Sequence, residues 1–259
     1  MTSMGSGSRT ALVTGASAGI GRAIAIAFGE LGWKVAIGAR RIDALAETAT
    51  AVTDAGGTAF AQSLDVTDPD SVETFVADAA GALGSIDVLV NNAGCAWPGD
   101  IAAIEPDRLR DMLATNVLGS LLASRAVVGR LLAVDAPGDV VFISSDTAHS
   151  PRPGLVTYGA TKAAVEHIAR GLAHEVEGTG IRVTTVRVGP TITDFASGWG
   201  DPKQFADLVE RWQHFGIQRH WGVMEPADVA RAVVLAVTTP PGAHLDTIEV
   251  QPVAPRPPS

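Results

Sequence analysis

The stretch that decides the fold is TALVTGASAGIG at residues 10–21, near the start of the chain. Residues 10–14 form a short apolar run, which is typical of a strand buried in a parallel sheet. Three glycines follow with the spacing Gly-x-x-x-Gly-x-Gly, and an apolar helical face with Ile20, Ile24, Phe28 and Leu31 begins among them. A strand, a glycine-rich turn and a helix in this order predict a dinucleotide site, because glycines let the backbone approach a pyrophosphate and a helix N-terminus offers unpaired N–H groups. The residues expected to line this turn are Gly15, Ser17, Ala18, Gly19, Ile20 and Gly21.

Strand-like and helix-like stretches alternate along the rest of the chain with short connections. Further strands are expected at 34–38, 58–64, 86–90, 139–144, 181–188 and 247–250, and helices at 42–55, 69–83, from about 106, and at the stretch 158–162. This alternation predicts a single α/β domain, a Rossmann-like doubly wound parallel sheet of about seven strands with helices on both faces. The domain is expected at 9–252, between a flexible tail at 1–8 and a proline-rich tail at 253–259.

Composition narrows the class of protein. The 259 residues carry a net charge of -9, which argues against nucleic acid or an anionic membrane as a partner. The single cysteine, Cys95, excludes an intramolecular disulfide and suits a reducing compartment. No apolar run approaches the length of a membrane span, and the first eight residues lack the apolar core of a signal peptide. We therefore expect a cytoplasmic protein with no nucleic-acid partner, no membrane partner and no metal site.

Polar residues follow several of the predicted strands at their carboxyl ends, where ligands bind in such sheets. Asn91-Asn92-Ala93-Gly94 follow the fourth strand, and Ser144-Ser145 follow the fifth. Asp65 and Val66 end the third strand and could cap an adenine ring. Such residues can also be simple strand caps, and for Asn91 that alternative stays open, but their convergence on one edge favours a site.

A tyrosine and a lysine stand four residues apart on a predicted helix. Tyr158 is the only tyrosine in the chain, and the i, i+4 spacing places Lys162 on the same helical face. A neighbouring cation favours the phenolate and lowers the pKa of a tyrosine toward the working range. The alternative is a tyrosine at a helix start beside a solvated lysine.

These motifs together resemble the short-chain dehydrogenase/reductase family, in its single-domain branch of about this length. The residues that carry the resemblance are Thr14-Gly15-x-x-x-Gly19-x-Gly21, Asn91-Asn92-Ala93-Gly94, Asn116, Ser145 and Tyr158-x-x-x-Lys162. The resemblance implies that Tyr158 exchanges the proton of the carbonyl or hydroxyl oxygen and that Ser145 hydrogen-bonds that oxygen. It implies that Lys162 holds the nicotinamide ribose and lowers the pKa of the tyrosine, and that Asn116 positions a water in a proton relay to Lys162.

The resemblance also bears on three further positions. Ser145 is favoured over Ser144 because its thirteen-residue separation from Tyr158 fits the family's usual loop, with Ser144 closing the strand. Val188-Gly189 replaces the family's frequent Pro-Gly, yet Thr191 and Thr193 match positions that hold the nicotinamide carboxamide. His149 stands near a position where the family often has glycine; it could reach a substrate, or it could be solvated.

The end of the second strand predicts the cofactor. Enzymes that use NAD(H) place a carboxylate there, whereas this strand ends in Ala39 and is followed by Arg40 and Arg41. Guanidinium groups match the geometry of a phosphate. We therefore predict NADP(H), although the two arginines could instead be a solvated pair opening the next helix.

The segment 195–225 is the expected substrate lid. It holds six of the thirteen aromatic residues of the chain: Phe195, Trp199, Phe205, Trp212, Phe215 and Trp221. Part of the segment also fits an amphipathic helix packed on the core. Cys95 and Trp97 could line the same pocket, but nothing near Cys95 in sequence would activate it as a nucleophile. Apolar walls favour an apolar or aromatic substrate.

The sequence thus predicts an NADP(H)-dependent oxidoreductase acting on a small ketone, aldehyde or secondary alcohol. The alternatives are an epimerase or dehydratase that uses the same tyrosine, and a non-catalytic NADP(H)-sensing regulator. The resemblance further implies a homo-oligomer, a tetramer built from dimers, through the helix at about 106–132 and the helix after Tyr158. The first helix presents Leu109, Leu113, Leu121 and Leu131, which could also serve the core of the monomer.

Overall fold

The computed structural model describes residues 8–196, 199, 202–218 and 220–256. Seven parallel strands form one sheet in the order β3-β2-β1-β4-β5-β6-β7, which confirms the predicted doubly wound α/β fold. The strands are β1 (Thr10–Thr14), β2 (Lys34–Ala39), β3 (Thr58–Ser63), β4 (Val88–Asn91), β5 (Gly138–Ser145), β6 (Ile181–Val188) and β7 (Thr247–Val250). Parts of the predicted tails and lid, at 1–7, 197–198, 200–201, 219 and 257–259, lie outside the described residues.

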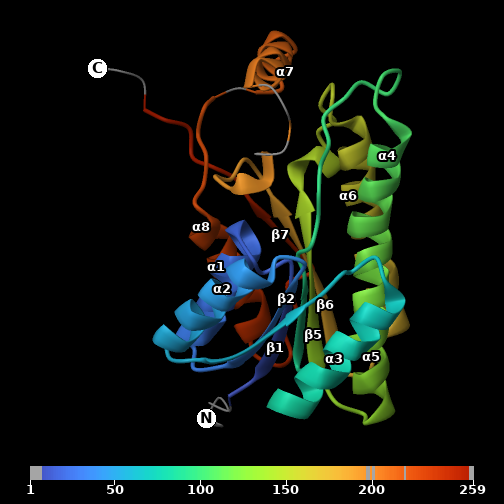
Figure 1. The fold of residues 1–259 in the computed structure, drawn as a ribbon, viewed down its shortest axis with the longest axis vertical. Helices are drawn as coiled ribbons and strands as arrows, with labels where there is room; N and C mark the ends of the chain where they lie inside the picture. The colour runs from blue at the N-terminus through green and yellow to red at the C-terminus, as the bar shows by residue number, and fades with distance from the viewer. Residues whose placement is uncertain (1–7, 197–198, 200–201, 219, 257–259) are drawn as a thin grey trace.

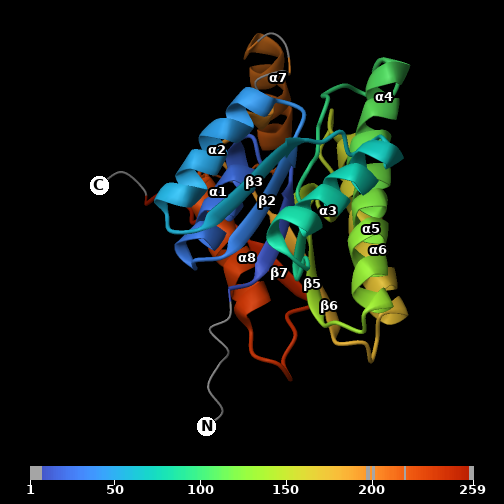
Figure 2. The ribbon, with the colours of Figure 1, turned by 60° about the horizontal axis from the view of Figure 1, so that its bottom comes forward.

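Helices cover both faces of the sheet (Figures 1 and 2). One face carries α1 (Gly19–Glu30), α2 (Ile42–Asp54) and α8 (Pro226–Thr238). The other face carries α3 (Pro69–Leu83), α4 (Pro106–Met112), α5 (Gly119–Ala133) and α6 (Val156–Glu175). The last long helix, α7 (Pro202–His214), lies beyond the carboxyl ends of the strands in Figure 1.

Burial explains why the central strands are apolar without alternation. Every residue of β1, β4 and β5 is buried, because helices pack on both faces of the sheet. The edge strands β3 and β7 are instead partly exposed. Phe28 of α1 is fully buried on one face, and Phe75 of α3 is fully buried on the other. Two separate apolar layers therefore hold the sheet rigid beneath the site.

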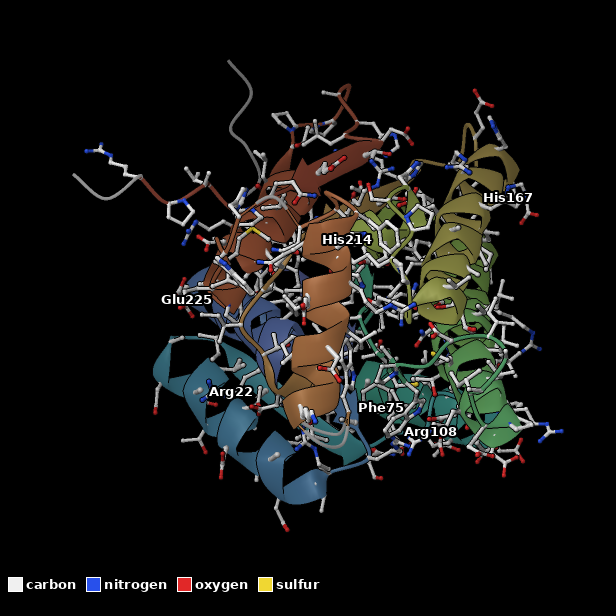
Figure 3. The ribbon with its side chains drawn as sticks, turned by 90° about the horizontal axis from the view of Figure 1, so that it is seen from above. Arg22, Phe75, Arg108, His167, His214 and Glu225 are labelled. Carbon is white, nitrogen blue, oxygen red and sulfur yellow. The ribbon has the colours of Figure 1, made fainter. Side chains whose placement is uncertain are left out.

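The direction in which the chain winds reverses between β1 and β4, which are neighbours in the sheet. A reversal of this kind opens a crevice at the carboxyl ends of the strands. Figure 3 looks down on this edge: α7, marked by His214, lies between the layer that carries Arg22 and the layer that carries Arg108 and His167. The fold therefore places the candidate motifs beneath α7.

Several boundaries differ from the expected ones, and one difference affects the site. Strand β5 runs through Ser145, whereas we expected Ser144 to close it. The long helix expected from about 106 is divided, because residues Leu113–Leu118 between α4 and α5 are wound as a π-helix. A single π-turn inside a helix is frequent at functional sites, and this one contains Asn116.

The stretch Pro106–Ala133, which the sequence analysis did not single out, is long and apolar enough to cross a membrane by length and composition alone. Half of its most apolar window is buried inside the protein, as in the core helix of a globular domain. Leu131, expected at a subunit interface, is buried in this core, whereas Leu113 and Leu121 are exposed. Only part of the predicted interface is therefore free for another subunit.

Candidate active site

A cavity of about 760 Å³ opens at the carboxyl ends of the strands, and Phe205, Val209 and Trp212 of α7 form part of its lining. It is lined by nearly all of the residues predicted from the sequence: Gly15, Ser17, Ala18, Gly19, Ile20, Arg40, Arg41, Asp65, Val66, Asn92, Ala93, Gly94, Ser145, Tyr158, Lys162, Thr191 and Thr193. Gly21 and Asn116 are outside this lining. Residues from seven separate segments of the chain thus converge on one site.

The glycine-rich turn forms one wall and closes tightly on the loop after β4. Gly15 has φ +67°, a left-handed conformation that glycine adopts without strain, and a Cβ there would lie 2.8 Å from the Cα of Ala93. Asn92 Nδ2 donates a hydrogen bond to the carbonyl of Thr14 at 2.9 Å. Gly21 packs its backbone against the same Asn92 amide, so a side chain there would clash. At Gly15 the turn therefore presents bare backbone to the cavity, near the N-terminus of α1.

The end of the cavity beside β2 is positively charged. β2 ends at Ala39, and the exposed Arg40 and Arg41 follow at the cavity rim. Arg41 Nη2 donates to Ser17 Oγ at 3.2 Å, which brings this guanidinium beside the glycine-rich turn. Hydrogen bonds from Thr67 lower the pKa of Asp65, so its carboxylate is charged near Arg40. An anionic group here would meet two arginines.

Tyr158 lies in the first turn of α6 and faces the cavity from the opposite end. The residue keeps some exposed surface toward the cavity. Burial of its hydroxyl nevertheless raises the pKa of Tyr158, and a hydrogen bond with Ser145 offsets only part of this rise. The expectation that the cation of Lys162 would bring the pKa of Tyr158 below its ordinary value is therefore wrong for the protein without bound cofactor. Desolvation of the phenolate outweighs the favourable charges.

Lys162 is buried one turn further along α6. Its Nζ donates to the carbonyl of Ile143 at 2.8 Å and lies 5.8 Å from the centre of the Tyr158 ring. Burial lowers the pKa of Lys162 to about 8, so most of the amine is still protonated at pH 7. The amine is thus held in the cavity wall, beside Gly94.

The two serines at the end of β5 have different partners. Ser145 Oγ accepts hydrogen bonds from Thr147 N at 3.2 Å and from Thr147 Oγ1 at 2.9 Å, and it also bonds with Tyr158. Ser144 Oγ donates to Glu166 Oε1 at 2.8 Å. Ser145 is therefore the serine that shares a hydrogen bond with the tyrosine, as the sequence spacing suggested.

Asn116 acts behind the cavity rather than in it. Its Nδ2 donates to Cys95 O and Thr161 Oγ1, both at 2.9 Å, and its Oδ1 accepts from Cys95 N at 2.8 Å. The side-chain amide therefore ties the loop after β4 to α6. The proton relay expected through Asn116 stays a prediction.

Several other expectations are decided by contacts. Asn91 donates to Ser124 Oγ at 2.9 Å in the core, so the alternative of a structural residue is the right one. His149 is outside the cavity lining; its Nε2 donates to Glu166 Oε2 at 2.7 Å, and the Arg187 guanidinium lies beside it. Cys95 and Trp97 do line the cavity. Burial raises the pKa of Cys95 to about 11, which leaves it a thiol at neutral pH.

The predicted lid contributes a row of aromatic rings to the cavity. Successive centroids along Tyr158, Phe195, Trp199, Phe205 and Trp212 lie 5.6–6.4 Å apart. Trp221 also lines the cavity, whereas Phe215 is exposed and does not. One face of α7 is also buried, through Leu208, Val209 and Trp212. The helix is therefore amphipathic and packed on the protein, as the alternative proposed, and it also lines the cavity, as the lid prediction proposed.

Sequence reasoning missed an ion pair in the cavity wall. Arg152 donates to both carboxylate oxygens of Asp146, at 2.7 Å each. The two residues lie in the loop between β5 and α6 and both line the cavity. A loop has no periodicity that would predict such a contact; adjacency of Asp146 to Ser145 was the only signal.

A model of the short chain dehydrogenase family matches residues 9–204 of the chain. The chain belongs to the short-chain dehydrogenase family of oxidoreductases.

Relatives and solved structures agree with this assignment. The glycine betaine reductase of Emericella nidulans is 35% identical over 94% of this chain, which spans only 19% of that longer protein. An alcohol dehydrogenase from Thermococcus sibiricus, solved with 5-hydroxy-NADP, is 27% identical with a TM-score of 0.81 over 98% of this chain and 100% of its own. A serine dehydrogenase solved in its closed form with NADP+ is 30% identical, with a TM-score of 0.80 over 93% of this chain and 94% of its own.

Proposed function

We propose that the chain is an NADP(H)-dependent oxidoreductase that transfers a hydride between nicotinamide and the carbon of a small, mostly apolar ketone, aldehyde or secondary alcohol. The observation that carries the proposal is the cavity itself. It joins a glycine-rich turn and two arginines at one end to a hydrogen-bonded tyrosine and serine at the other.

The residues present fit a dinucleotide phosphate. Gly15 and Gly21 bring bare backbone to the N-terminus of α1, where a pyrophosphate is stabilised by N–H groups and by the helix dipole. Arg40 and Arg41 would hold a 2′-phosphate, and Asp65 and Val66 would lie against the adenine. Asn92, Ala93 and Gly94 would line the path to the nicotinamide, with Thr191 and Thr193 beside its carboxamide and Lys162 at its ribose. Two of the solved relatives described above also hold an NADP-type cofactor.

The chain's own residues account for the proton. When bound, the nicotinamide supplies or accepts the hydride. During reduction Tyr158 donates its proton to the carbonyl oxygen, and during oxidation it accepts the proton of the alcohol. Ser145 holds that oxygen by a hydrogen bond, and the buried Lys162 stabilises negative charge as it develops on the phenol. The aromatic row excludes water and receives the apolar part of the substrate.

The test is a panel of ketones, aldehydes and secondary alcohols, assayed with NADPH and with NADP+ through the absorbance of the reduced nicotinamide. The proposal expects turnover of at least one carbonyl–alcohol pair, with a preference for apolar members. Tight cofactor binding without turnover of any member would favour the regulator alternative. Assembly as a homotetramer and a cytoplasmic location stay predictions.

A further inference from the structure

The Asp146–Arg152 ion pair in the cavity wall is next to the reacting hydroxyls. Asp146 follows Ser145 directly, and Ser145 Oγ lies 3.3 Å from Asp146 Oδ1 in donating geometry. Both charged groups act on the Tyr158 hydroxyl: the carboxylate of Asp146 raises the pKa of Tyr158, and the guanidinium of Arg152 lowers it. The pair therefore lies within electrostatic reach of both hydroxyls that would hold the substrate oxygen.

Stability alone does not explain this pair. Arg152 is buried, with 8% of its surface exposed, and its Nε–H has no hydrogen-bond partner among the residues that the structure describes. Burying charges costs desolvation energy, and an unpaired buried donor adds to that cost. An apolar pair of similar volume would often be as stable or more stable. Some other role must therefore explain why charges lie here.

The hydrogen-bond distances around Ser145 bear on where its proton lies. Ser145 has one proton, and Thr147 is a donor to it, so in the protein without substrate this proton is shared between two acceptors, Asp146 Oδ1 and the oxygen of Tyr158. The bond to Asp146 is long, at 3.3 Å, whereas both oxygens of Asp146 accept short bonds of 2.7 Å from Arg152. A carboxylate neutralised by a bidentate arginine is a weaker acceptor for a second donor. Ser145 can therefore exchange this bond for one to a substrate oxygen at little cost.

Arg152 is also held from the side of the lid. Its guanidinium lies over the ring of Trp212, 5.7 Å from the centroid. Trp212 Nε1 in turn donates to the carbonyl of Pro153 at 2.8 Å. Contacts from α7 thus keep the guanidinium in the orientation that pairs with Asp146.

We propose that Asp146 and Arg152 form a positioning unit for the reacting hydroxyls, in which Arg152 neutralises and holds Asp146 so that the proton of Ser145 can turn to the substrate oxygen. This inference rests on the proposed oxidoreductase function of the same site. Neither residue touches the reacting atoms; both act through Ser145 and through the charge that Tyr158 experiences.

The proposal predicts opposite effects for the two charges. Arg152→Gln leaves a bare carboxylate beside Tyr158, so the pH midpoint of alcohol oxidation, which requires the phenolate, should move upward by about one pH unit. Asp146→Asn should move the midpoint downward. The double variant Asp146→Asn/Arg152→Gln removes both charges and should return the midpoint close to that of the wild type. The other groups acting on Tyr158 are Cys95 and the cation of Lys162, which none of these variants changes.

A matched control separates this role from a structural one. Arg182 forms a partly buried pair with Asp139 at the opposite, amino-terminal end of β5 and β6, at 2.7 Å. Arg182→Gln should lower the unfolding temperature without moving the pH midpoint. If Arg152→Gln behaves like Arg182→Gln, with lower turnover or stability and an unchanged midpoint, the positioning role is refuted.

The single tyrosine of the chain provides a readout that does not need a substrate. Tyrosine labelled with 13C at Cζ gives one NMR signal, and the pH dependence of that signal with NADP+ present reports the phenolate of Tyr158 alone. The pH midpoint of Tyr158 ionisation should be lowest in Asp146→Asn, intermediate in the wild type and highest in Arg152→Gln. Equal midpoints would overturn the inference even if no substrate is found. Correctly ordered midpoints in a protein that turns over no carbonyl or alcohol would instead contradict only the proposed function. If Arg152→Gln does not fold, the shift in Asp146→Asn alone decides.

Discussion

Cofactor selectivity offers a prediction whose size follows from the structure. At the cavity rim, β2 ends in Ala39 with no carboxylate, and Arg40 and Arg41 are both exposed there. Hydrogen bonds to charged groups contribute about 1.5–3 kcal/mol each, which corresponds to roughly ten- to hundred-fold in affinity. Solvent screens an exposed guanidinium, so we expect the lower half of this range for each arginine.

The assay is kcat/KM for NADPH and for NADH on one substrate. Wild-type protein should prefer NADPH, and Arg40→Ala and Arg41→Ala should each reduce that preference by roughly ten-fold through the NADPH value alone. The preference should also fall as ionic strength rises, because the arginines are exposed. Arg125→Ala is the control, since Arg125 is an exposed arginine paired with Glu73 on the far side of the sheet.

Two results would refute this reasoning. A wild-type preference for NADH would show that Arg40 and Arg41 at the cavity rim do not bind a 2′-phosphate. An unchanged ratio in both single variants would show that the selectivity lies elsewhere. Ala39→Asp provides a converse test, because a carboxylate at the end of β2 should repel the 2′-phosphate and shift the preference toward NADH.

Three further predictions concern the turn, the assembly and the charge network. Gly15→Ala, strained at φ +67°, should weaken NADPH binding at least about ten-fold in calorimetry, whereas the unobstructed helical Gly81→Ala should leave binding unchanged. Leu121→Asp, on the exposed face of α5, should reduce the sedimentation coefficient if that face joins subunits; an unchanged value would exclude it. Burial disfavours charge on Glu166, but hydrogen bonds from Arg187, His149 and Ser144 lower its pKa to about 2. The ionised Glu166 carboxylate therefore stabilises the folded protein above the unfolded pKa of 4.5, and this stabilisation is lost as the pH falls toward 2. Glu166→Gln should lower the free energy of unfolding at pH 7 but much less near pH 2. An equal loss at both pH values would contradict this.

The sequence predicted the sheet well because burial on both faces produces uninterrupted apolar runs. β6 and β7 were placed at the bounds that the structure shows, and α3 was marked by a proline at its first position. Strand ends were less predictable, as at β5, because the polar Ser144 and Ser145 do not mark the point where pairing stops. The π-turn at Leu113–Leu118 was missed because its residues continue the apolar pattern of the flanking helices.

Within the site, local motifs were predictable and contacts between distant residues were not. Gly15, Tyr158 and Lys162 belong to patterns that a short stretch of sequence contains in full. The Asp146–Arg152 pair depends on how a loop folds back on itself. The direction of the Tyr158 pKa shift depends on burial, which the spacing to Lys162 does not reveal.

The most direct test of the proposed function is the variant Tyr158→Phe. The centroid of the Tyr158 ring lies 5.6 Å from that of Phe195, and phenylalanine keeps this packing while removing the hydroxyl that is the proton donor in the proposed role. Loss of a positioned acid costs on the order of a hundred- to ten-thousand-fold in rate. We predict that kcat falls by this amount with NADPH affinity, measured by calorimetry, nearly unchanged. Near-normal turnover in Tyr158→Phe would contradict the mechanism.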